Sequence, residues 1–456
     1  MYARYFNHDD FGDTMDGHEA NDKWDVQHGG FRIDWNMSAI DSLVFKGDFY
    51  DGDANELVGL RSGLESRNLD FSGGNLLARW EHVYSDTSEM SLQVYYDRTY
   101  RDTELFREER NTFDLDFQHS FALGSRHKFV WGLGYRFSTD GFSGFTGFQL
   151  DPSNRGLHLF STFLQNEVAI IKDLKLIFGT KLEHNDYTGL EVMPSAKILW
   201  TPFSRHTAWA AVTRAVKIPS RAFRDSVHTV ATFPLGPGRK GLVQILGTPD
   251  IESEKVYAYE LGYRFQPIER LSIDIATFYN NYYDLQTGEE KDSFKISPTE
   301  TVFPIFNDNE MHGDTYGFEI SADWDVTEHW KLKAGYTFLQ MQLHLNKASI
   351  SEGTEDDEEE GLNSRNRAYL LSYLNLPHNI EVDTSLYYVD HLSTNDIPSY
   401  LRLDMRLGWK PTEFLDISFG VKNMLDGEHR EFPTGSDRLE TTELERSIYG
   451  RITFQF

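Results

Sequence analysis

The chain has 456 residues, no cysteine and a formal net charge of −28 at pH 7. The lack of cysteine excludes structural disulfides and cysteine-ligated metal sites, and the acidic balance argues against nucleic acid as a partner. Aromatic residues make up 14% of the chain, the mean hydropathy is −0.51, and no run approaches the roughly 18 apolar residues that a membrane helix needs. A membrane-spanning structure with this composition would have to be a closed β-barrel, because open sheet edges cannot be satisfied in lipid.

The N-terminal residues predict a strand at once, since Met1 is followed by Tyr-Ala-Arg-Tyr-Phe at positions 2–6. No signal peptide precedes this strand. A protein of the bacterial outer membrane needs an export signal, so we expect the N-terminus to be incomplete.

Four segments farther along alternate apolar and polar residues with the period of two that is typical of a strand. They are residues 128–137, 256–265, 401–410 and 447–456. The last ends on Phe454 and Phe456, as the closing strand of an outer-membrane barrel does. Alternation alone also fits a soluble β-sandwich, but the strand length and the aromatic residues that end each apolar row favour apolar side chains that face lipid.

Short turns and long polar connections are predicted to alternate along the chain. The short turns are residues 38–41, 86–88, 122–126, 172–174, 202–205, 266–269, 327–329, 377–379 and 411–413. The long connections are residues 8–23, 52–70, 139–156, 217–254, 285–312, 343–364 and 427–443. This asymmetry is typical of outer-membrane barrels with periplasmic turns and extracellular loops. The segments predict about twenty strands, with both termini at the periplasmic side. A β-propeller would not combine very short with very long connections.

Several stretches together resemble the barrel of TonB-dependent outer-membrane receptors. They are QNE at 165–167, LIFGTKLEHNDYTG at 176–189, MPSAK at 193–197, LWTP at 199–202, WAAVTRAVKIPS at 209–220, YELGYR at 259–264, FYNN at 278–281, GVKNMLD at 420–426 and RITFQF at 451–456. Each stretch is weak alone, and their order and spacing over nearly the whole chain make the resemblance specific.

The resemblance implies an all-β transmembrane antiparallel barrel of 22 strands, normally filled by an N-terminal plug domain. Family members bind ferric siderophores, cobalamin or other scarce nutrients and use an energising inner-membrane complex to import them. Residues 1–456 would be a single barrel domain, without the plug, the TonB box and the first hairpin. The TonB complex would then be a partner only if a plug and TonB box are supplied.

Five residues in the long connection 217–254 are candidates for ligand binding by an extracellular loop: Arg221, Arg224, His228, Arg239 and Lys240. Such cationic side chains could hold an anionic ferric siderophore through charge and hydrogen bonds. The alternative is a solvated loop that packs against lipopolysaccharide phosphates.

Charged side chains are expected on the lumen-facing side of the strands, namely Glu260, Arg264, Arg402, Asp404 and Arg406. The family resemblance implies that they pair with a plug or with each other. Three glycines, Gly179, Gly262 and Gly420, are expected to mark bends or close packing in curved sheet.

Metal and cofactor signals are weak in this sequence. Residues 355–360 form a run of six carboxylates that could bind divalent cations, although they lack the spacing of an EF-hand and also fit a solvated acidic loop. The 16 histidines are scattered, and His184, His228, His312 and His344 show no ligand spacing. We therefore predict no cofactor and no metal site.

Other classes of function remain as alternatives. No Gly-x-Ser-x-Gly elbow and no His-Glu-x-x-His helix is present, so the sequence predicts no enzyme. A passive channel or a non-functional truncated receptor is the main rival, because a wide lumen without a plug conducts. We expect a receptor or transporter barrel in a Gram-negative outer membrane, in contact with lipid and lipopolysaccharide, for TonB-dependent uptake of a ferric siderophore.

Overall fold

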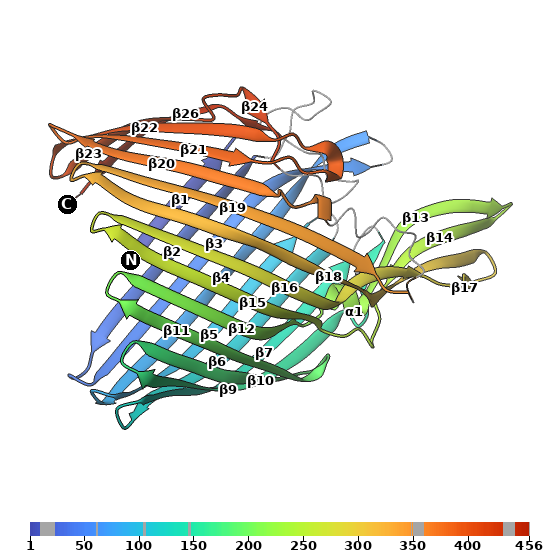
Figure 1. Ribbon diagram of the computed structural model, residues 1–456. Helices are drawn as coiled ribbons and strands as arrows, with labels where there is room; N and C mark the ends of the chain where they lie inside the picture. The colour runs from blue at the N-terminus through green and yellow to red at the C-terminus, as the bar shows by residue number, and fades with distance from the viewer. Residues whose placement is uncertain are drawn as a thin grey trace.

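The protein is a single large, mostly antiparallel β-sheet of 24 strands that curves into a barrel (Figure 1). The structure, a computed structural model, describes residues 1–9, 23–60, 63–103, 106–144, 147–347, 349, 360–431 and 443–455. Phe456 and most of the acidic run, residues 355–359, lie outside the described residues. No helix within the described part is both long and apolar enough to cross a membrane.

Twenty strands follow one another around the wall. They are β1 (Tyr2–His8), β2 (Trp24–Asn36), β3 (Asp41–Leu60), β4 (Gly63–Ser85), β5 (Ser88–Asp102), β6 (Phe106–Leu123), β7 (His127–Gly144), β9 (Asn154–Ile171), β10 (Leu174–Asn185), β11 (Gly189–Phe203), β12 (His206–Lys217), β15 (Glu254–Ile268), β16 (Leu271–Glu290), β18 (Glu300–Thr327), β19 (Trp330–Leu345), β20 (Asn366–Leu376), β21 (Ile380–Val389), β22 (Tyr400–Thr412), β23 (Leu415–Lys422) and β26 (Ser447–Phe454). Each pairs antiparallel with the next wall strand, and the expected number of about twenty strands is confirmed for the described residues.

The remaining elements lie outside this succession. They are β8 (Phe148–Leu150), α1 (Arg221–Asp225), β13 (Ser226–Gly236), β14 (Arg239–Leu246), β17 (Phe294–Lys295), the 3-10 helix η1 (Thr394–Asp396), and β24 (Glu428–His429) with β25 (Leu444–Glu445). The last two strands pair only with each other as a separate small sheet.

The two ends of the barrel differ as the sequence predicts. Turns of two to four residues join β2 to β3, β4 to β5, β6 to β7 and β9 to β10 at one end. The first turn is closed by backbone hydrogen bonds from Met37 and Ser38 to the Asp41 carbonyl. β26 runs toward this end, where the Gln455 amide donates to the Phe414 carbonyl. The described C-terminal residues therefore lie at the short-turn side.

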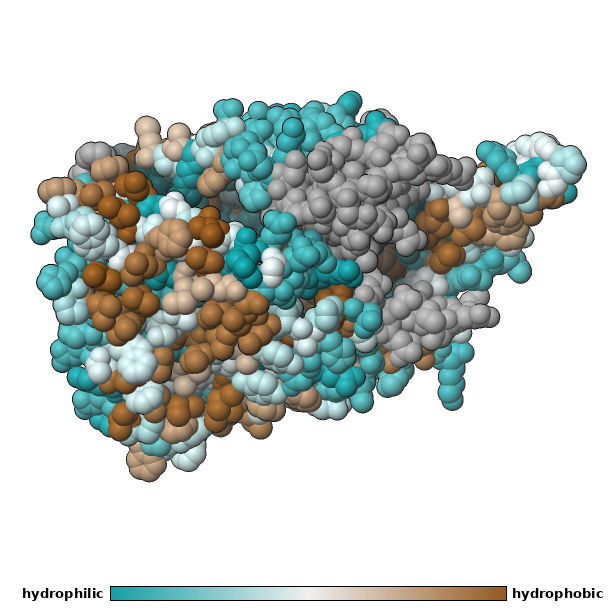
Figure 2. Space-filling model, turned by 90° about the horizontal axis from the view of Figure 1, so that it is seen from above, coloured by the Kyte–Doolittle hydropathy of each residue, from teal (hydrophilic) through white to brown (hydrophobic). Residues whose placement is uncertain are grey.

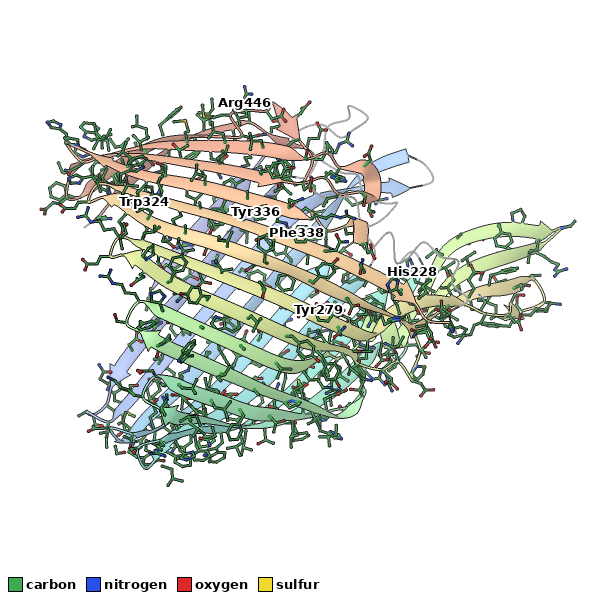
Figure 3. All side chains as sticks on the ribbon, in the orientation of Figure 1. His228, Tyr279, Trp324, Tyr336, Phe338 and Arg446 are labelled. Carbon is green, nitrogen blue, oxygen red and sulfur yellow. The ribbon has the colours of Figure 1, made fainter. Side chains whose placement is uncertain are left out.

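The two faces of the wall differ in polarity, because apolar and polar side chains alternate along each strand. Leu133, Leu261 and Ile452 belong to the apolar rows and are 52%, 62% and 64% exposed. Figure 2 shows apolar side chains in a band over the half of the wall nearer the short turns. Trp324 lies at the short-turn end of that face, and Tyr336 and Phe338 lie farther along it (Figure 3). This arrangement confirms the outward apolar face and its aromatic margins.

Several connections that we expected to be loops are continued strands instead. β3 and β4 pair without a break to Leu60 and Gly63, so residues 52–60 and 63–70 are paired strands. β7 likewise extends to Gly144, and β18 begins at Glu300 rather than after residue 312. The polar composition led us to predict loops there. Pairing continues beyond the membrane because it satisfies the backbone N–H and C=O groups in water as well as in lipid.

An extension of the sheet, here called the arm, projects from the long-connection end of the barrel (Figure 1). It consists of β13, β14, β17 and the first residues of β18. β14 pairs antiparallel with β13 and parallel with β18, from Lys240 opposite Glu300 to Leu246 opposite Phe306. Parallel pairing is otherwise absent from the described strand pairs of the wall.

The sheet has two edges within the described residues. β1 pairs with β2 alone, and β26 pairs with β23 alone. The two edge strands run antiparallel to each other, because β1 runs toward the long connections and β26 runs toward the short turns.

Glycines in the wall make room for aromatic rings on the neighbouring strand. A Cβ at Gly262 would overlap the indole of Trp209, and one at Gly420 would overlap the ring of Tyr449. Gly179 lies against the Leu164 carbonyl and Gln165. The expected close packing at these three glycines is therefore confirmed.

Candidate functional site: the mouth of the barrel

The long-connection end carries a buried ion-pair network centred on α1. The Arg221 side chain is only 4% exposed, and its Nε donates to Asp225 Oδ2 at 3.0 Å. Its Nη1 and Nη2 donate to Asp140 and to the Pro152 carbonyl. Arg155 Nη1 donates to both Asp225 oxygens at 2.5 and 2.6 Å. Each buried charge thus has at least one opposite partner, as burial requires.

This network holds α1 against the inner side of the wall. Asp140 continues the row of β7 that contains Arg136, which is opposite the apolar row of Trp131 and Leu133. Arg155 is paired with Asp140 across β7 and β9 and shares its side. The segment of residues 218–225, here called the mouth segment, therefore turns into the lumen at the barrel's mouth.

Next to the mouth segment is a pocket of about 490 Å³, lined by Tyr187, Glu191, Arg224 and Lys255 and by residues 249–253. The Arg224 guanidinium lies 4.9 Å from the Tyr187 ring centroid and donates to the Tyr187 carbonyl at 3.3 Å. Arg155 lies on the same ring at 5.4 Å. The two cations hold the ring in place from the wall and from the mouth segment.

The groups in this pocket favour ligands that combine charge with hydrogen-bonding oxygens. Burial raises the pKa of Tyr187, which lies in the turn between β10 and β11, so its phenol stays protonated at neutral pH. Thr188 donates to Glu191 at 2.9 Å, and Ser253 donates to Thr188 at 3.0 Å. Lys255 pairs with Glu252 at 2.9 Å and with Asp284 at 2.5 Å. Among the described residues, no carboxylate forms an ion pair with Arg224, the other cation that lines the pocket.

The five residues expected to bind ligand do not converge on one place. Arg221 and Arg224 belong to the mouth segment, and Arg221 is fully engaged in the buried network. His228 lies near the base of the arm (Figure 3), where its ring meets Phe148 edge-on at 5.4 Å. Arg239 and Lys240 lie at the far end of the β13–β14 hairpin. There Lys240 pairs with Glu300 at 2.8 Å, and this hydrogen bond lowers the pKa of Glu300.

The charges expected to face the lumen are mostly paired with other charged side chains, either within one strand or across neighbouring strands. Arg264 meets Asp274 at 2.6 Å, and Arg402 meets Asp404 at 2.8 Å. Arg406 bridges Glu381 at 3.0 Å and Asp383 at 2.8 Å. Glu260 is the exception, with no ion-pair partner in the described part of the chain.

Sequence reasoning missed Asp140, Arg155, Tyr187 and Asp225. Their positions are 15 to 85 residues apart in the sequence. Pairing of β7 with β9 and the turn of α1 back onto the wall bring them together. No local motif could have revealed the network.

The fold defines a transmembrane β-barrel with a pocket at its mouth. The family model described as "TonB dependent receptor-like, beta-barrel" matches residues 2–424. The chain belongs to this family, whose proteins lie in the outer membrane of Gram-negative bacteria.

Curated relatives include an iron-regulated outer-membrane protein and a probable siderophore receptor. The chain is 23% identical over 286 residues to the iron-regulated outer membrane virulence protein of Vibrio cholerae, a match that covers 58% of this chain and 40% of the relative. It is 25% identical over 219 residues to the probable TonB-dependent siderophore receptor PiuA of Acinetobacter baumannii, covering 45% of this chain and 28% of that protein. The chain thus spans less than half of the relatives it matches.

Solved structures share the fold at low identity. The siderophore receptor PirA from Pseudomonas aeruginosa aligns with a TM-score of 0.69 at 13% identity, over 95% of this chain and 71% of that one. The FrpB iron transporter from Neisseria meningitidis aligns with a TM-score of 0.76 at 12% identity, over 100% of this chain and 76% of that one.

Proposed function

We propose that this chain is the barrel domain, residues 1–456, of an outer-membrane receptor that takes up a ferric siderophore in a TonB-dependent way. Support comes from the family of the barrel. It also comes from the names of the relatives, one an iron-regulated outer-membrane protein and another a probable siderophore receptor. We propose a receptor or transporter role and no enzymatic activity.

The observation that carries the proposal is the pocket formed by Tyr187 and Arg224 at the mouth. A ferric siderophore presents oxygen-rich, often anionic surfaces around its metal. A guanidinium offers several parallel N–H donors to such oxygens, and the Tyr187 ring holds the Arg224 guanidinium in position. Both side chains stand at the inner margin of the mouth, where a ligand must pass.

The buried network prepares this pocket before the ligand arrives. Arg221 fixes α1 to β7, and Arg155 fixes Tyr187 from the wall side. Groups that are held in the bound arrangement lose less conformational entropy on binding. The network therefore supports affinity without touching the ligand.

The energised step belongs to the whole protein. We propose that the TonB complex acts through a plug and TonB box, and that the lumen-facing charges present a hydrated, polar wall to that plug. The ion pairs of Arg264, Arg402 and Arg406 keep this wall close to neutral locally.

Iron-limited growth tests the proposal. Cells that lack the native gene would carry the full-length gene, either unchanged or with Arg224→Ala, and would receive a panel of ferric siderophores as sole iron source. We expect growth on at least one siderophore with the unchanged gene. Uptake should fall about 10–100-fold in the variant, since a hydrogen bond to a charged group is worth about 1.5–3 kcal/mol.

Arg239→Ala is the matched control, because Arg239 is exposed at the far end of the arm. It should leave uptake within about twofold, the range of an exposed charge. The alternative function, a passive channel, is supported by the polar lumen of the barrel. Iron uptake independent of every siderophore, together with steady conductance in a planar bilayer, would support that alternative and contradict the receptor.

A further inference from the structure

Two histidines face each other on the outer side of neighbouring strands near the extracellular end. His312 of β18 is paired directly with His344 of β19. The two ring centroids are 5.7 Å apart, at an interplanar angle of 56°, and both residues are exposed. They are 32 positions apart in the sequence, so no short metal-ligand motif joins them. The pairing of β18 with β19 brings the two rings side by side.

The pair lies in water beyond the membrane. His344 is 14 positions past Trp330, the first residue of β19 at the short-turn end. A strand needs only about 9–11 residues to cross the bilayer. His344 also shares the alternating row of Tyr336 and Phe338, so the two rings point away from the lumen. An ion from outside reaches them without entering the barrel.

Hydrogen bonds fix which nitrogen of His312 is free. Asn346 Nδ2 donates to Glu310 Oε2 at 3.1 Å, which turns the amide oxygen of Asn346 toward His312. That oxygen lies 2.8 Å from His312 Nδ1 and can only accept, so Nδ1 carries the proton. Nε2 of His312 therefore presents a lone pair. Protein ligands of metals are commonly oriented by such an outer hydrogen bond on the second ring nitrogen.

The spacing of the rings fits a shared ion. With a metal–nitrogen length of about 2.0–2.1 Å, two imidazoles on one ion have centroids no more than about 6.4 Å apart. The observed 5.7 Å is within this limit. In the described part of the chain, no group of three or more His, Cys, Asp or Glu side chains is arranged to hold a metal. The pair would thus act as a two-nitrogen chelate whose other positions are filled by water.

The surroundings of the pair favour a cation. Glu310 and Asp314 lie two positions on either side of His312, in the same alternating row. Glu360 accepts a hydrogen bond from the Leu343 amide, next to His344, at 2.5 Å. These carboxylates and the net charge of −28 raise the local concentration of divalent ions.

We propose that His312 and His344 form a binding site for a divalent first-row transition metal ion, with the order Cu²⁺ above Zn²⁺ and Ni²⁺. Imidazole nitrogen suits these metals, and the order follows their general affinity for nitrogen ligands. The site is separate from the mouth pocket and does not depend on a siderophore.

Calorimetric titration of the full chain, folded in detergent, with CuCl₂ and then ZnCl₂ tests the site. We expect one ion per chain in the tighter binding step. His312→Gln and His344→Gln should each abolish that step, because one imidazole cannot chelate. Asn346→Ala should weaken it about tenfold, the lower end of effects from outer hydrogen bonds. His391→Gln, an exposed histidine paired with the adjacent Asp390, is the matched control and should change nothing.

Electron paramagnetic resonance of the Cu²⁺ form gives a second readout that does not depend on the variants folding. We expect splitting from two imidazole nitrogens in the unchanged protein. A spectrum with oxygen ligands only, or an undiminished binding step in the double variant His312→Gln, His344→Gln, would overturn the proposal.

Discussion

The wall and the mouth of this barrel are built by different kinds of interaction. In the wall, every strand is paired with its neighbours, and each side chain is directed outward or inward by its place in an alternating row. In the mouth, the chain leaves that rhythm, and residues from β7, β9, α1 and the β10–β11 turn meet through buried charges. The wall therefore tolerates change that respects the alternation, whereas the mouth depends on individual partners.

The largest expected effect is at the mouth. Arg221→Ala would leave Asp140 and Asp225 buried with one cation fewer each, and breaking buried ion pairs costs up to about 3–5 kcal/mol. Hydrogen exchange should speed up at the Gly247 and Thr248 amides, which bond to Ser226 and Phe223 beside α1. Arg239→Ala should leave these amides protected. Equal protection in both variants would mean that the network does not hold the mouth segment.

The next largest effect is expected when a charge is placed on the lipid face of the wall and not on the lumen face. Leu261→Arg places a charge on the lipid face and should cost about 2–4 kcal/mol in the free energy of unfolding in bilayers. Thr337→Arg, on the lumen side opposite Glu319, is the control and should cost much less. Denaturant titration in lipid vesicles measures both. A similar cost for the two variants would contradict the assignment of the faces.

Substitution of a closely packed glycine in the wall should lower the stability of the barrel by a smaller amount. Gly262→Ala forces a methyl group into the Trp209 ring, and overpacking of this kind costs about 1–3 kcal/mol. Gly450→Ala meets no atom within 4 Å and serves as the control. Unfolding midpoints in vesicles should fall for the first variant only. No difference between them would show that Trp209 moves aside freely.

The smallest effect is expected for a single lumen ion pair. The Arg264 side chain is 65% exposed, so its pairing with Asp274 is screened by water. Arg264→Ala should change the free energy of unfolding by no more than about 1 kcal/mol, again measured by denaturant titration. A loss as large as that of Arg221→Ala would remove the distinction between wall and mouth.

This division explains what could be predicted from the sequence. The rows of β7, β15, β22 and β26 were visible because strand direction is a local property of alternate residues. The long β3–β4 hairpin was taken for a loop, since polar residues on both faces hide a strand that stands in water. The arm was also taken for loops, although β13 and β14 carry apolar residues. Arg224 was recognised as a cation in a long connection, but Tyr187 and the partners of Arg221 lie on other strands. Contacts of that kind depend on the pairing and curvature of the sheet, which no short window of sequence contains.

Direct binding to the mouth tests the central claim. Quenching of tryptophan fluorescence would be titrated with a panel of ferric siderophores on the full chain folded in detergent, alongside Arg224→Ala and Arg239→Ala. The account predicts saturable binding of at least one ferric siderophore, with affinity lowered about 10–100-fold by Arg224→Ala and unchanged by Arg239→Ala. Equal affinity in all three proteins would contradict the assignment of the mouth pocket as the recognition site.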